Sequence, residues 1–187
     1  MIEGKYILHG VSSSIACYKA VELARLFLKA EAEVRVIMTE NATKMVQPIQ
    51  FEALTGNPVY VDVFSNRNQW QVEHVVASKW GDVLIVAPAT ANILAKMAHG
   101  IADDALTTMY LAFPGKTFVA PAMHQEMWKH PATMRNIDIL KERGTVIIGP
   151  EKGDLASGDE GVGRMSDPQK IFDIIKEFFE SAESQRE

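Results

Sequence analysis

The chain has 187 residues, of which 47% are apolar and 23% are charged, which is enough for one compact domain with a buried core. A formal net charge of −5 and the lack of any Lys/Arg cluster exclude the phosphate-binding surface typical of nucleic-acid-binding proteins. No apolar run approaches the ~18 residues of a membrane span, and residues 1–6 lack the features of a signal peptide. Because the single Cys17 cannot form an internal disulfide, we expect a reducing, cytoplasmic location.

Five short apolar runs predict the strands of a sheet. None of them alternates between apolar and polar residues, which is typical of parallel strands that are covered on both faces. The runs are Tyr6–Leu8, Val34–Met38, Val83–Ala87, Thr117–Ala120 and Val146–Ile148.

Helical patterns lie between these runs and after the last one, with suitable start or stop residues in place. Because strands alternate with helices, right-handed βαβ units are implied. We therefore predict a single α/β domain over residues 1–180, built as a three-layer, doubly wound parallel sheet. The predicted helices are Ile15–Ala30, Pro48–Leu54, Ala91–Ala98, Pro131–Leu140 and Pro168–Phe179.

Three segments fall outside this pattern. The polar segment Phe64–Trp70 is interpreted as a surface loop. Residues 149–166 contain five glycines and several acidic residues, which predicts a long irregular segment and a candidate lid. Residues 181–187 are expected to form a frayed tail.

Hydroxyl side chains follow the first three predicted strands. Ser13 and Ser14 lie in a turn of small residues before a helix, where hydroxyls and free helix N–H groups suit a phosphate. Thr39 and Thr90 follow the second and third strands. An ordinary serine N-cap is the alternative, and neither GxGxxG nor GxxxxGK[ST] is present. Three such turns at one edge of the sheet favour a phosphate-containing cofactor.

Two further turns carry polar groups at the same edge. In Ala87–Asn92, the side chains of Thr90 and Asn92 are suited to the edge of a planar ligand, although a capped helix start would explain them too. In Pro121–Trp128, a buried strand ends at proline and a helix begins, which is where open α/β sheets bind ligands.

Several motifs, taken together and in order, resemble the homo-oligomeric flavin-containing cysteine decarboxylases, which have a Rossmann-like flavoprotein fold. The resemblance covers residues 4–180. The motifs are His74, Lys79–Asp82, Ala87–Asn92, Pro121–Met123 with Met127–Trp128, and Ala156 with Gly158–Asp159, Gly161 and Gly163–Met165.

This resemblance implies the cofactor FMN, a catalytic His74 and a substrate flap at 153–165. It assigns the substrate carboxylate to the turn that contains His124 and Met127, and it implies a homotrimer or homododecamer. Arg164 is a candidate for the substrate phosphate, with an exposed, solvated side chain as the alternative. The FMN-binding positions that it implies are Ser13, Ser14, Ile15, Thr39, Thr90, Ala91, Asn92 and Ala122.

The branch that matches best acts on 4′-phosphopantothenoylcysteine and forms 4′-phosphopantetheine in coenzyme A biosynthesis. There, flavin oxidises the substrate cysteine so that CO₂ can leave, and His74 would accept the thiol proton.

The chain departs from the family at Ser157, where a proton-donating cysteine is usual. A hydroxyl is a far weaker acid than a thiol, so Asp159 or a water is the alternative donor. His124 occupies a position where asparagine is commoner in the family. Asp103–Asp104 occupies a pair of positions where Asp-Asn is commoner.

Two other functions therefore stay open. One is oxidative decarboxylation of another cysteine-ended substrate to an enethiol, and the other is a non-catalytic, flavin-binding regulatory subunit. We expect no metal site, because the spacing of His124, Glu126 and His130 is not that of HExxH. We expect His9 and Cys17 to be structural core residues.

Overall fold

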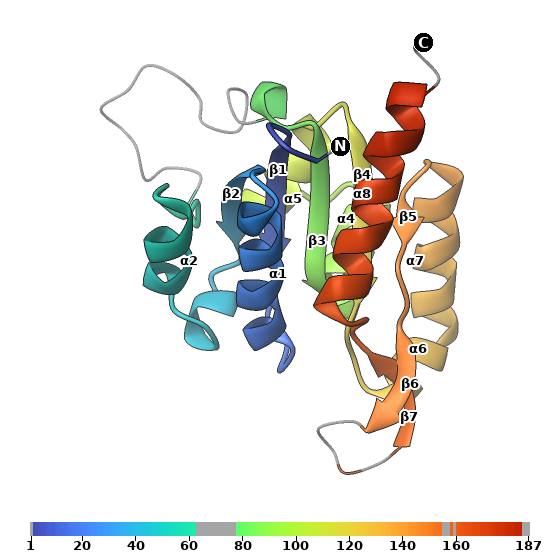
Figure 1. The fold of residues 1–187 in the computed structure, drawn as a ribbon. Coiled ribbons are helices and arrows are strands. Elements are labelled where there is room, and N and C mark those ends of the chain that lie inside the picture. Colours follow the sequence, from blue (N-terminus) through green and yellow to red (C-terminus); the bar gives the residue numbers. More distant parts are fainter. Residues whose placement is uncertain (1, 63–77, 155–157, 159, 185–187) are drawn as a thin grey trace.

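The computed structural model describes residues 2–62, 78–154, 158 and 160–184 (Figure 1). Its centre is a five-stranded parallel sheet in the order β2-β1-β3-β4-β5. All five predicted strands are confirmed, and the order reverses direction between β1 and β3. The strands are β1 (Tyr6–Val11), β2 (Glu33–Met38), β3 (Val83–Ala89), β4 (Lys116–Pro121) and β5 (Val146–Ile147).

Helices cover both faces of the sheet, which confirms the predicted three-layer architecture (Figure 1). Successive strand residues point to opposite faces, so Ile7 packs into one apolar cluster and Leu8 into the other. The first cluster is covered by α1 (Cys17–Lys29), α2 (Pro48–Thr55) and α8 (Pro168–Ser184), and the second by α4 (Ala91–His99), α5 (Ala105–Ala112) and α7 (Pro131–Glu142).

The predicted helices are confirmed, and glycine ends two of them. Gly56 and Gly100 follow α2 and α4 with φ of 68° and 70°, in the left-handed region that lacks a steric penalty only for glycine. The sequence analysis missed α5, whose residues are apolar or small on most sides and show no amphipathic stripe. It also left out η1 (Ala42–Lys44), and α6 (Gln125–Lys129) is a single short helix within the predicted turn.

The prediction of an irregular segment over 149–166 is wrong for half of its length. Strands β6 (Glu151–Asp154) and β7 (Glu160–Arg164) form an antiparallel hairpin at the end of the sheet where β3 terminates (Figure 1). The glycines of β7 mark close contacts rather than a lack of structure. Both are buried, Gly163 against the backbone of Met123 and Gly161 against the side chain of Gln125.

Helix α8 extends four residues into the expected tail and ends at Ser184. The rest of that tail and the predicted loop 64–70 lie outside the described residues. Trp80 packs as expected. The centroids of the Trp80 and Tyr6 rings are 4.8 Å apart, and the Arg35 guanidinium lies 4.4 Å from the centroid of the Trp80 ring. None of the helices in the described ranges combines the length and apolar composition that crossing a bilayer requires.

His9 lies in the middle of β1 and is completely buried. Its Nε2 is 2.9 Å from the Ala87 carbonyl oxygen, so Nε2 carries the proton and donates it to this bond. The His9 and Phe51 rings are nearly perpendicular, at 85°, with 6.3 Å between their centroids. Burial lowers the pKa of His9 from 6.5 to about 4, because a charged imidazole would lose its hydration in the core.

This lowered pKa predicts a loss of stability in acid. Between pH 6.5 and pH 4 the unfolded chain binds a proton at His9 that the folded chain does not, so stability falls as the pH falls through this window. We expect His9 to contribute about 3 kcal/mol to this decline, at 1.36 kcal/mol per pKa unit. Urea denaturation across the window should show a shallower decline for His9→Gln. Equal pH slopes for the two proteins would contradict the buried neutral imidazole.

Candidate active site

The carboxyl ends of β1 to β4 meet at one edge of the sheet, and the turns that follow them carry the predicted ligand-binding residues. Ser13–Ile15 follow β1, Thr39 follows β2, Thr90–Asn92 follow β3, and Ala122 follows β4. The Ala122 N–H donates to the Ala89 carbonyl at 3.0 Å, which ties the ends of β4 and β3 together. Positions far apart in the sequence are thus gathered at the edge where doubly wound proteins bind ligands.

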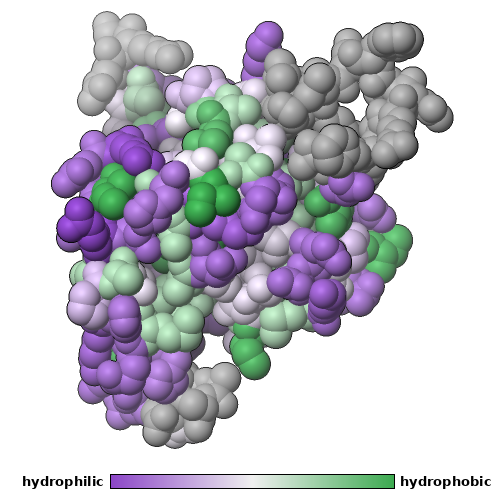
Figure 2. Space-filling view, turned by 180° about the vertical axis from the view of Figure 1, so that it is seen from behind, coloured by the Kyte–Doolittle hydropathy of each residue, from purple (hydrophilic) through white to green (hydrophobic). Residues whose placement is uncertain are grey.

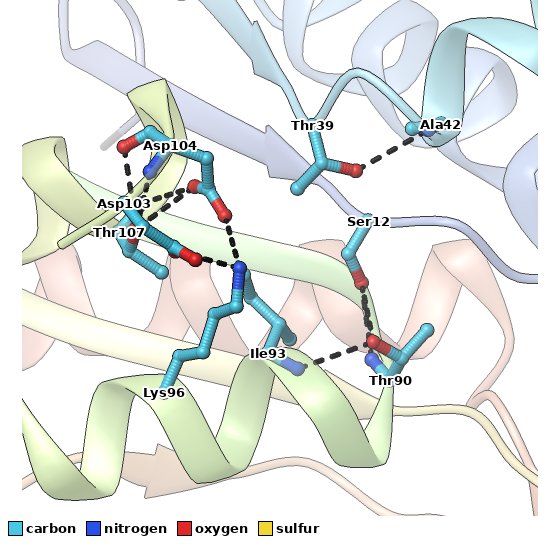
Figure 3. A network of polar contacts seen from close by, with 9 residues as sticks. All are labelled: Ser12, Thr39, Ala42, Thr90, Ile93, Lys96, Asp103, Asp104 and Thr107. Carbon is cyan, nitrogen blue, oxygen red and sulfur yellow. Dashed lines mark hydrogen bonds and ion pairs between the residues drawn. The ribbon is translucent and has the colours of Figure 1, made fainter. Parts of the chain in front are cut away.

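A buried hydroxyl joins the turns after β1 and β3 (Figure 3). Ser12 Oγ donates to the Pro88 carbonyl at 2.9 Å and accepts the Thr90 N–H at 3.0 Å. Thr90 Oγ1 then accepts the Ile93 N–H at 3.3 Å and caps α4. Ser12 was not among the predicted site residues. Its place beside two other serines after an apolar strand was the only available signal, and that signal did not separate it from Ser13.

The turn between β1 and α1 keeps hydroxyls near the start of the helix. Ser14 Oγ accepts the Ala16 N–H at 3.2 Å. The N-cap residue of α1 is Ala16, which has no side-chain cap, so the simple serine N-cap is not realised. Ile15 leaves 65% of its surface exposed. Cys17 donates its S–H to the Ser12 carbonyl at 3.3 Å, and burial raises the pKa of its thiol. Cys17 is a core residue, as predicted.

Two neighbouring elements complete this edge. After β2, Thr39 Oγ1 accepts the Ala42 N–H at 3.2 Å and turns the chain into η1. Between α4 and α5, Lys96 Nζ is paired with Asp103 at 2.6 Å and with Asp104 at 3.0 Å (Figure 3). Asp104 also accepts the Thr107 N–H and caps α5. The hydrogen bond from Lys96 also lowers the pKa of Asp103. Through their ion pairs with Lys96, Asp103 and Asp104 join α4 to α5.

His124 caps α6 and its ring is fixed by that cap. Nδ1 accepts the Glu126 N–H at 3.3 Å, so the neutral ring carries its proton on Nε2. His130 caps α7 in the same manner, with the Ala132 N–H 3.2 Å from Nδ1. Residues 2–62, 78–154, 158 and 160–184 contain no group of three or more His, Cys, Asp or Glu side chains arranged to hold a metal ion.

The remaining predicted residues divide into two sets. Met127 on α6 is 50% exposed, and Arg164 is exposed at the end of β7. Trp128 packs against the second apolar cluster, as expected. His74, Ser157 and Asp159 lie outside the described residues. The structure therefore gathers the predicted cofactor residues at one edge and leaves the predicted proton-transfer groups as predictions.

The strand order and the hydroxyl-bearing turns define a doubly wound α/β protein with a ligand site at its switch point, suited to a phosphate-bearing cofactor. A family model matches residues 1–180, and the chain belongs to the Flavoprotein family. The resemblance drawn from the motifs is confirmed.

The chain spans about half the length of the curated relatives that it matches. The bifunctional coenzyme A biosynthesis protein CoaBC of Bacillus subtilis (strain 168) is 44% identical over 179 residues, which are 96% of this chain and 44% of that protein. A solved mutant PPC decarboxylase complexed with pantothenoylaminoethenethiol is 34% identical, with a TM-score of 0.87 over 95% of this chain and 100% of its own. The FMN-dependent cysteine decarboxylase SpaF is 34% identical, with a TM-score of 0.78 over 91% and 96% of the two chains.

Replacement of Ser12 tests the bridge between the two turns. Ser12→Ala leaves the partly buried Thr90 N–H without its acceptor, which should lower the free energy of unfolding by about 1–3 kcal/mol. Urea denaturation measures this loss. The same substitution at the exposed Ser181, whose hydroxyl bonds within α8, should change stability by less than about 0.5 kcal/mol. Equal stability of the two variants would contradict the bridge.

Proposed function

We propose that this chain is an FMN-dependent carboxy-lyase that converts 4′-phosphopantothenoylcysteine to 4′-phosphopantetheine in coenzyme A biosynthesis. The observation that carries the proposal is the likeness to the solved PPC decarboxylase, at a TM-score of 0.87 over 95% of this chain. The name of the Bacillus subtilis relative supports the same pathway. Because the chain spans less than half of that relative, the proposal concerns the decarboxylation step alone.

The edge of the sheet supplies donors that fit FMN. Hydroxyls at Ser13, Ser14, Thr39 and Thr90, together with the first N–H groups of α1, suit a phosphate and a polar ring edge. The Ser13 hydroxyl is half-buried and makes no bond within the described part of the chain, so it can donate to a ligand. When bound, FMN supplies the electron sink that a cysteine carboxylate lacks. The residues proposed to hold it are Ser13, Ser14, Ile15, Thr39, Thr90, Ala91, Asn92 and Ala122.

His124 is suited to orient the substrate carboxylate. Because Nδ1 accepts the Glu126 N–H, the Nε2–H is directed away from the helix cap as a hydrogen-bond donor. An asparagine amide at this position would donate in a similar way, so we propose that His124 keeps the hydrogen bond to the substrate carboxylate. Met127 would contribute apolar contact, and Arg164 would pair with the substrate phosphate.

Proton transfer falls to residues beyond the described ranges. We assign the acceptance of the substrate thiol proton to His74, since an imidazole with an ordinary pKa of ~6.5 is suited to this task at neutral pH. Asp159 is the proposed proton donor in the final step. A role for Ser157 requires that its hydroxyl relay a proton from a neighbour, because a hydroxyl is too weak an acid to replace a thiol.

Assembly into a homotrimer or homododecamer is part of the proposal, in keeping with the cytoplasm as the location. Large apolar side chains lie exposed around the start of α1 and of α2: Ile15, Tyr18, Met45 and Ile49 are between 49% and 65% exposed. On the face that Figure 2 shows, the most strongly apolar residues are separated from one another by less apolar and hydrophilic ones. A surface next to the ligand edge is thus the better candidate for contact between copies. Sedimentation equilibrium distinguishes three copies from twelve.

Product analysis tests the proposed reaction. The purified protein should be yellow and should release CO₂ and a free thiol of the mass of 4′-phosphopantetheine from 4′-phosphopantothenoylcysteine. A product two hydrogens lighter, with reduced flavin, would instead identify oxidative decarboxylation to the enethiol. A yellow protein that gives neither product, together with co-purification of another protein, would identify the regulatory alternative.

Substitution of His74 tests the assigned proton acceptor. His74→Asn should lower kcat by about 100-fold or more, the usual range for loss of a general base, while the flavin content stays the same. The matched control is His130→Asn, because asparagine also caps helices well and His130 caps α7. Steady-state kinetics should show wild-type turnover for the control. Comparable turnover for both variants would remove His74 from the mechanism.

A further inference from the structure

Strand β7 docks onto the turn that carries His124 through its backbone. The Met123 N–H donates to the Gly163 carbonyl at 2.9 Å. A Cβ at position 163 would lie inside van der Waals distance of the Met123 carbonyl oxygen, with the Gln125 nitrogen at 3.3 Å. Both obstacles are backbone atoms, which cannot rotate away. Glycine at position 163 is therefore a requirement of this contact.

The neighbouring glycine extends the contact along the strand. A Cβ on Gly161 would collide with the side-chain oxygen of Gln125 and would lie 3.1 Å from the Gln125 Cβ. Gly161 and Gly163 are both buried, and they lie on the same face of β7 because side chains alternate along a strand. Met123 and Gln125, the residues that they contact, flank His124. The position of the His124 turn is thus set by the path of β7.

A buried lysine fastens the end of this strand to the ligand edge. Lys19 is in the first turn of α1 and is only 7% exposed, and its Nζ donates to the Met165 carbonyl at 3.1 Å. Burial, followed by repulsion from Arg164, lowers its pKa, whereas Asp167, Glu151 and Glu22 act in the opposite direction. A lysine is buried in this way only when it is paired or hydrogen-bonded. An ion pair between Lys170 Nζ and Glu151 Oε1, 2.8 Å apart, also holds the base of the hairpin.

We propose that β7, through glycine at 161 and 163 and its anchor Lys19, positions His124 so that Nδ1 stays bound to the Glu126 N–H and Nε2–H stays directed at the substrate carboxylate. Gly163 and Lys19 are positioning residues, since they act through His124 and not on the substrate. The inference rests on the proposed function for the identity of the carboxylate. The fixation of the His124 ring is independent of that function.

Two glycine variants in the same hairpin test the positioning role, one of them by steady-state kinetics. Gly163→Ala forces β7 away from Met123, whereas Gly153→Ala on β6 meets only the flexible Arg164 side chain, at 3.2 Å and 3.3 Å. We expect Gly163→Ala to raise KM about tenfold, with kcat changed by less than about threefold, because the lost contact with the carboxylate weakens binding of the ground state and of the transition state alike. Because Arg164 is itself assigned to the substrate phosphate, Gly153→Ala is used only in the spectroscopic test below. The control for KM is Ser181→Ala, whose exposed hydroxyl bonds within α8, and it should keep the wild-type KM. Flavin content and melting temperature, measured alongside, report folding.

A second readout does not depend on activity. Nitrogen-15 spectra of histidine-labelled protein at pH 8 identify which ring nitrogen of His124 carries the proton, with His124→Asn used for assignment. The wild type and Gly153→Ala should have the proton on Nε2. Gly163→Ala should show a mixture of the two tautomers, because the cap bond to Glu126 is no longer held. If the wild type is inactive, the proposed function fails, and these spectra still decide the positioning role.

Lys19 supplies the second variant in case Gly163→Ala does not fold. Lys19→Met keeps the buried side-chain volume but removes the donor to Met165, whereas Lys19→Arg keeps a donor. We expect Lys19→Met to shift the His124 tautomer and to raise KM in the same direction as Gly163→Ala, by a smaller factor, and Lys19→Arg to restore much of both. A folded Gly163→Ala or Lys19→Met protein with the wild-type tautomer and KM overturns the proposal.

Discussion

The parallel alignment of β1 to β4 is the constraint on which the whole site depends. Parallel strands bring all their carboxyl ends to one edge, so the turns that follow them become neighbours although they lie up to about a hundred residues apart in the chain. The reversal of order between β1 and β3 opens this edge. The bridge from Ser12 to the turn after β3 then fixes the two sides of the opening relative to each other.

Much of this arrangement could be predicted from the sequence, for identifiable reasons. Strands buried on both faces are continuous apolar runs, so all five were found, and glycine ended helices where it adopts a positive φ without a steric penalty. Thr39 and Thr90 were located because a hydroxyl that directly follows a buried strand is visible in a linear sequence. Helix α5 was missed because it is apolar on nearly all sides and has no periodic stripe to reveal it.

The hairpin could not be predicted, because a glycine can be required for two structural reasons that a single sequence does not distinguish: an unusual backbone angle or a close neighbour. At Gly158 the φ of 88° calls for a residue without a side chain, whereas at Gly163 the angle is ordinary and the neighbouring backbone excludes a Cβ. The second reason depends on Met123, some forty residues away, and becomes visible only once the fold is known. Lys19 was overlooked for a related reason. Its partner is a main-chain carbonyl, and because every residue has one, the sequence does not indicate this contact.

The burial of Cys17 has a consequence for an enzyme whose proposed product is itself a thiol. Exchange between a protein cysteine and a small thiol or its disulfide requires an accessible thiolate. The only sulfhydryl in the chain is 2% exposed, has a raised pKa and is already engaged with the Ser12 carbonyl. The protein can therefore accumulate its product under mildly oxidising conditions without forming mixed disulfides with it.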